Sequence, residues 1–112
     1  MVNVNIDLIE CTLDMTGHAG AAEEGQPDLV CCACSTAAQW LLYSLEELKE
    51  RTGKIEKITY SMDKGEMHIK VRPKEYGRIS TRARLQYAIE CFEMLEDAYP
   101  DKIHMNTGKE DE

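Results

Sequence analysis

The residues with the clearest chemical potential lie between positions 17 and 35. His18 stands on a glycine-containing loop, and Cys31 follows thirteen residues later, at the start of a predicted helix. The N-terminus of a helix carries unpaired N–H groups and the positive end of the helix dipole, and both favour a thiolate. A nearby imidazolium does the same, and an unperturbed pKa of ~6.5 suits histidine to act as a base. This pair predicts a nucleophilic cysteine activated by a histidine.

Three cysteines compete for the role of nucleophile, because Cys31, Cys32 and Cys34 fall within four residues. Asp28 is a good N-cap residue, which places Cys31 at the third helical position, near the end of the loop. Cys32 then points ~100° away around the helix. Cys34 returns to the apolar stripe, where a thiol behaves as a small hydrophobe. We therefore expect Cys31 to be the nucleophile, with the first-turn N–H groups as an oxyanion hole.

Other interpretations of the cysteines remain open. Cys31 and Cys34 form a C-x-x-C pattern, so a thiol-disulfide redox protein is the second hypothesis, although a loop and not a strand precedes the helix. A zinc site ranks third, because Cys11 and Cys91 are isolated and no histidine pair accompanies them. A binding module without catalysis is a further alternative. We expect no metal and no cofactor.

Length and composition limit the class of protein. The chain has 112 residues, 43% of them hydrophobic, which suffices for one core. No apolar run approaches the ~20 residues that span a bilayer, and the N-terminus lacks the basic start of a secretory signal. We therefore expect a cytoplasmic protein, away from membranes, with its five cysteines as thiols. The net charge of −8 and the dispersed basic residues argue against nucleic acid as a partner.

The N-terminal segment predicts β-structure. Residues 2–8 alternate apolar and polar side chains, as a half-buried strand does. The alternation changes phase at Leu8 and Ile9, and no Gly, Pro or Asn-Gly pair stands there to make a tight turn. We expect one long bulged strand, or two short strands in sequence. Residues 17–27, which contain three glycines and Pro27, form the following loop.

A helix and a hairpin come next. The helix is expected to begin near Asp28 and to end at Gly53. Residues 55–62 and 66–72 predict a β-hairpin around Asp63-Lys64-Gly65. Its inward-facing side chains are expected to be Ile58, Tyr60, Met62, Met67, Ile69 and Val71.

The last part of the chain predicts a second helix over 79–99, capped near Ser80, and leaves room for a short strand at 103–106. The apolar stripe of this helix comprises Leu85, Ala88, Phe92, Leu95 and Tyr99. The order β-α-β-β-α, with the extra strand, indicates an α/β fold of the α+β type: a small, mostly antiparallel sheet with two helices packed on one face. We expect one domain over 1–108 and a loose acidic tail over 109–112.

The stretch that carries the chemistry resembles a known family. Its pattern consists of Gly17-His18-Ala19, then Gly25, then Asp28-Leu29-Val30-Cys31, and finally Ser35. In this order and spacing it is similar to the ribosomal-processing cysteine protease family, called Prp.

This resemblance implies a specific activity. His18 and Cys31 would form the catalytic dyad, and Gly17, Asp28 and Ser35 would help to shape the site. The substrate would be the N-terminal extension of a bacterial large-subunit ribosomal protein, cut off by a homodimeric endopeptidase. The loop over 19–27 would move over that substrate.

The chain departs from the family pattern in three places. The His–Cys spacing is one residue longer, with Pro27 as the insertion, and Cys32 stands where the family has alanine. The N-terminus is also too short for the family's first hairpin with an ordinary turn. These departures motivate an alternative substrate, such as a phage structural protein.

Overall fold

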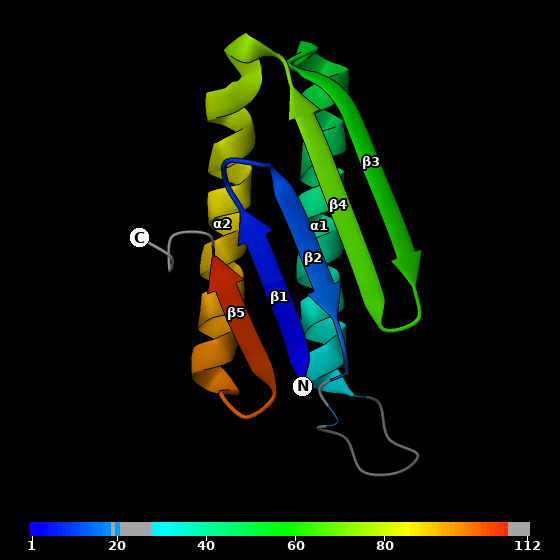
Figure 1. Cartoon of the computed structure of the whole chain (residues 1–112), viewed down its shortest axis with the longest axis vertical. Coiled ribbons are helices and arrows are strands. Elements are labelled where there is room, and N and C mark those ends of the chain that lie inside the picture. Colours follow the sequence, from blue (N-terminus) through cyan, green and yellow to red (C-terminus); the bar gives the residue numbers. More distant parts are fainter. Residues whose placement is uncertain (19, 21–27, 108–112) are drawn as a thin grey trace.

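The computed structural model of the chain describes residues 1–18, 20 and 28–107 (Figure 1). Its elements are, in order, β1 (Val2–Asp7), β2 (Thr12–Thr16), α1 (Leu29–Thr52), β3 (Ile55–Asp63), β4 (Glu66–Pro73), a 3₁₀ turn η1 (Glu75–Gly77), α2 (Arg78–Ala98) and β5 (Ile103–Thr107). The predicted tail over 109–112 and most of the predicted loop lie outside the described residues. No helix in the described part of the chain is long and apolar enough to cross a membrane.

The strands form one five-stranded sheet in the order β3-β4-β2-β1-β5. Three of its pairings are antiparallel, and β5 lies parallel to β1. Figure 1 shows α1 and α2 side by side on the same face of this sheet. The predicted fold class, a mostly antiparallel sheet with two helices on one face, is therefore confirmed.

The core lies between the helices and the sheet. It takes alternate side chains from the strands, such as Val2, Val4 and Ile6, because successive residues of a strand point to opposite faces. The helices contribute their apolar stripes, and Phe92 in the second half of α2 is fully buried. Tyr99, predicted to continue that stripe, is 45% exposed because α2 ends at Ala98.

The N-terminal segment differs from its prediction. We expected no tight turn, but β1 and β2 form an antiparallel hairpin in which Asp7 pairs with Thr12. Asp7 makes the turn without glycine, because its Oδ1 accepts the N–H groups of Ile9 (2.8 Å) and Glu10 (3.0 Å). Cys11 completes the turn in the left-handed region, with φ of 57°. The phase change at Ile9 thus marks the reversal of the chain, and the N-terminus is long enough for a hairpin.

The second hairpin forms where it was predicted, with Gly65 at φ of 79° in its turn. Met67, Ile69 and Val71 of β4 are buried, as predicted. The prediction for β3 is wrong in part, because Tyr60 and Met62 are more than half exposed. Strand β3 is the edge of the sheet, and only Ile55 is buried and Ile58 half-buried in it.

The helix boundaries follow their local signals to different degrees. Helix α1 begins after Asp28 and ends at Gly53, whose φ of 67° and N–H bond to Lys49 close the helix, as predicted. Helix α2 begins at Arg78, so the predicted cap at Ser80 is wrong. The turn η1 leads directly into α2, and no side chain caps its first residues. Ser80 lies inside the first turn of α2 instead.

Candidate active site

The backbone around His18 is fixed at the point where β2 ends. The Gly17 N–H donates to the carbonyl of Gly65 at 2.8 Å, which ties this segment to the β3–β4 turn. The His18 carbonyl accepts a hydrogen bond from the α-amino group of Met1 at 2.6 Å. Gly17 has φ of 95°, and a Cβ atom there would collide with the carbonyl oxygen of Met1. Glycine at position 17 is therefore needed for this path of the chain.

Cys31 is held in the first turn of α1 by the N-cap. The Oδ1 atom of Asp28 accepts the Cys31 N–H at 3.0 Å, and the Asp28 carbonyl accepts the Cys32 N–H at 3.0 Å. Cys31 is thus the third residue of the helix, half-buried, at the positive end of the helix dipole. The side chain of Asp28 is therefore engaged with the start of α1.

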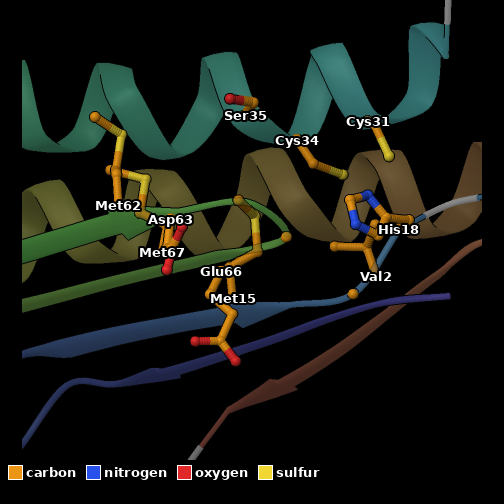
Figure 2. A pocket seen from close by; sticks show the side chains of 12 residues that line it. Val2, Met15, His18, Cys31, Cys34, Ser35, Met62, Asp63, Glu66 and Met67 are labelled. Atoms are coloured by element: carbon orange, nitrogen blue, oxygen red, sulfur yellow. The ribbon is translucent and has the colours of Figure 1, made fainter.

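Cys31 and His18 line the same cleft, which has a volume of about 220 Å³. Figure 2 shows the Cys31 thiol extending from α1 towards the imidazole of His18, which approaches from the end of β2. The other walls of the cleft are mostly apolar and include Val2, Met15, Met62 and Met67, while Asp63 and Glu66 add carboxylates. The fold therefore brings together the two residues that the sequence singled out, in a cleft able to admit a peptide side chain.

Gly65 is a residue of this site that sequence reasoning missed. We assigned it only to the β3–β4 turn, yet a Cβ atom at position 65 would lie 2.8 Å from Nε2 of His18. The absence of a side chain at Gly65 thus leaves room for the imidazole. Only tertiary structure reveals this contact, because the two residues are far apart in the sequence.

Ser35 also lines the cleft, one turn along α1 from Cys31 (Figure 2). Its hydroxyl accepts a hydrogen bond from Nε2 of Gln39 at 2.9 Å, so the group is oriented by its own helix. Ala19 and Gly25, which belong to the same sequence pattern, lie outside the described residues.

The remaining cysteines of the cluster have different surroundings. Cys34 is buried but reaches the cleft, and burial, together with the charges of Cys31, Asp28 and Cys91, raises its pKa to about 11. Cys32 is exposed and lines a separate apolar groove between α1 and α2, together with Cys91 and Trp40. Among the described residues, no group of three His, Cys, Asp or Glu side chains could hold a metal ion.

Comparison with known proteins identifies the family. The chain is similar to two crystal structures of the essential ribosomal processing protease Prp from S. aureus, each over 96% of this chain and 99% of that chain. One contains a covalently linked product peptide (24% identity, TM-score 0.69) and the other a substrate peptide (21% identity, TM-score 0.71).

A structure from Streptococcus mutans is also similar, with 20% identity and a TM-score of 0.64 over 95% of this chain and 90% of that chain. Likeness at such identities establishes a shared fold. A search of curated proteins finds no match. The model of the family described as cysteine protease Prp, however, matches residues 1–104. The chain therefore belongs to the cysteine protease Prp family and is a cysteine protease.

Proposed function

We propose that this protein is an endopeptidase with a Cys31–His18 dyad, and that it removes the N-terminal extension of a bacterial large-subunit ribosomal protein. The observation that carries the dyad is that Cys31 and His18 line one cleft from two separate elements, with the thiol directed at the imidazole (Figure 2). Support for the substrate comes from the family and from the S. aureus Prp, which is a ribosomal processing protease.

The dyad would work by covalent catalysis. His18 accepts the thiol proton, and the Cys31 thiolate attacks the scissile carbonyl to give a tetrahedral oxyanion. The amine leaves with the proton from His18, and water then hydrolyses the acyl-enzyme. The Cys31 N–H already serves the Asp28 cap, so the N–H groups of Leu29 and Val30 are the first-turn donors that we assign to the oxyanion.

The supporting residues have separate roles in this proposal. Gly17 sets the path of the chain that carries His18, and Asp28 holds the first turn of α1 in place. Ser35 offers a polar group to the substrate backbone within the cleft. None of the three takes part in bond making, so their loss is expected to lower activity less than loss of the dyad.

The cleft walls favour an apolar segment of substrate. Met15, Met62 and Met67 surround the cleft, and methionine adapts to apolar side chains of different shape. Met62 is 55% exposed because it lies at the end of the edge strand β3, so it remains able to contact a bound peptide. We therefore expect hydrophobic residues beside the scissile bond.

We further infer that the enzyme acts in the cytoplasm, where ribosomal proteins are made, as a homodimer. Apolar side chains on the outer side of the helices support a dimer, because Leu29, Trp40 and Met94 are each more than 40% exposed around one groove. Light scattering should give twice the chain mass of 12.7 kDa. A Trp40→Lys variant should lower that mass, and a wild-type protein that is monomeric at micromolar concentration would contradict the dimer.

Peptide cleavage tests the dyad and the substrate together. The purified protein is incubated with a synthetic peptide that spans the extension of the ribosomal protein, and with a scrambled peptide, and products are identified by mass spectrometry. Cys31→Ala and His18→Ala should each lose at least ~10³-fold in kcat/KM. Cys32→Ala is the matched control and should keep wild-type activity, because Cys32 lies in the other groove.

The outcomes separate the parts of the proposal. Full activity in Cys31→Ala would sink the dyad. Cleavage of a phage structural protein peptide, but not of the ribosomal peptide, would keep the dyad and replace the substrate. No cleavage, with a Cys31 thiol that resists iodoacetamide at neutral pH, would favour an inert binding module.

A further inference from the structure

A second thiol, that of Cys34, lies near the candidate nucleophile Cys31. Cys34 lies one helical turn beyond Cys31, and both side chains reach the same cleft (Figure 2). We propose that a hydroperoxide converts Cys31 and Cys34 to a reversible disulfide, which switches the protease off and protects its nucleophile from irreversible oxidation. This inference rests on the proposed role of Cys31 as the reactive thiol.

The spacing of the two cysteines brings a disulfide within reach. Residues three apart on a helix have Cβ atoms about 5–6 Å apart, whereas a disulfide needs about 3.5–4.5 Å. The gap of roughly 1–2 Å has to be closed by the first turn of α1. The Cys31 N–H is bonded to the side chain of Asp28, which can rotate together with that turn, so this movement does not require the cap to break.

The different surroundings of Cys31 and Cys34 give the two thiols different reactivity. Cys31 is half-buried at the helix start, facing His18, so it is the sulfur that a peroxide can reach. Cys34 is only 1% exposed, and burial raises its pKa to about 11, so it stays a thiol at neutral pH and resists direct oxidation. One sulfur is thus suited to react first and the other to capture the product.

The chemistry has two balanced steps. The Cys31 thiolate attacks one oxygen of hydrogen peroxide, the O–O bond breaks, and Cys31 sulfenic acid and hydroxide form. The Cys34 sulfur then attacks the sulfenic sulfur, an S–S bond replaces the S–O bond, and the released hydroxide leaves as water with the Cys34 proton. Peroxide is reduced to water and the two thiols are oxidised by two electrons. A dithiol reductant reduces the Cys31–Cys34 disulfide by thiol-disulfide exchange and restores both thiols.

The other cysteines are less well placed to capture Cys31. Cys32 and Cys91 line the groove on the other side of α1, and Cys11 lies in the turn between β1 and β2. Cys91 does act electrostatically on Cys34, so a Cys34–Cys91 pair is the main competitor. The experiment therefore has to identify the partner of Cys31.

The test is made on the full chain, with hydrogen peroxide as the oxidant and dithiothreitol as the reductant. Thiols are counted by alkylation after denaturation, together with the intact mass. Wild-type protein should fall from five reactive thiols to three and lose the mass of two hydrogen atoms. Fragmentation of the chain should assign the link to Cys31 and Cys34. This readout needs no peptidase activity, so its failure is distinguishable from a failure of the proposed function.

Variants decide between the proposal and its competitors. Cys34→Ala, or Cys34→Val if the smaller side chain impairs folding, leaves four cysteines and cannot form the link. Without Cys34, peroxide should oxidise Cys31 beyond sulfenic acid to the sulfinic acid, which dithiothreitol does not reduce. Cys32→Ser and Cys91→Ser should behave as wild type, with at least tenfold recovery of peptide cleavage after reduction. A wild-type protein that takes up oxygen without a Cys31–Cys34 link, or a link that persists in Cys34→Val, would overturn the proposal.

Discussion

Replacing Gly65 by alanine should separate the catalytic geometry from the stability of the fold. The new Cβ atom would lie 2.8 Å from Nε2 of His18, whereas ordinary contact begins at 3.4 Å. The imidazole must therefore withdraw by at least about 0.6 Å, the difference between these two distances. A displacement of ~1 Å at a reacting group can cost about 10²-fold, so we expect kcat to fall on the order of tenfold.

The left-handed backbone of Gly65 adds a cost that does not concern catalysis. Alanine at φ of 79° is expected to destabilise the protein by about 1–2 kcal/mol. A domain with a typical stability of about 5–15 kcal/mol stays almost fully folded after that loss, so unfolding cannot explain a tenfold fall in activity.

Gly53→Ala provides the matched control. Gly53 has φ of 67°, close to that of Gly65, but a Cβ atom there meets nothing within 4 Å. Urea unfolding should give similar losses of stability for both variants, while peptide cleavage should fall only in Gly65→Ala. Equal activity in the two variants would refute the idea that the bare backbone at position 65 makes room for His18.

Two further predictions concern stability. Asp28→Ala should lower the free energy of unfolding by about 1 kcal/mol through loss of the N-cap, whereas Asp28→Asn should retain it, because asparagine caps as well as aspartate. Urea unfolding checks this, and equal losses in both variants would contradict the cap. The hydrogen bond to Asp14, at 2.7 Å, is the largest cause of the raised pKa of His68. Because the pKa is higher in the folded state, the stabilisation is full below the unfolded pKa of ~6.5 and fades as pH rises through the folded pKa. His68→Gln should therefore destabilise more at pH ~5.5 than at pH ~8, by less than about 1 kcal/mol because water reaches both side chains, which are 41% and 48% exposed. An equal effect at the two pH values would contradict this.

Most of the elements could be predicted because their signals are local. Asp28 and Gly53 mark the ends of α1 by their own chemistry, and the alternation along β4 follows from the period of a strand. The turn after β1 was missed, because an aspartate side chain and a left-handed Cys11 replace the glycine that usually signals a hairpin. The exposure of Tyr60 was missed as well, because position in the strand order decides which strand forms an edge.

The residue types of the candidate site could be predicted from the sequence, but the contacts that position His18 could not. The helix start selects Cys31 over Cys32 from the sequence alone, since the cap fixes which side chain of the first turn faces the loop. The position of His18 depends on contacts that no local pattern encodes. Its segment is bonded to the turn at Gly65, 48 residues from Gly17, and to the first residue of the chain. Cys31 is thus fixed by its own helix, whereas His18 is fixed by backbone that is distant in the sequence. We therefore expect substitutions in the β3–β4 turn to displace His18.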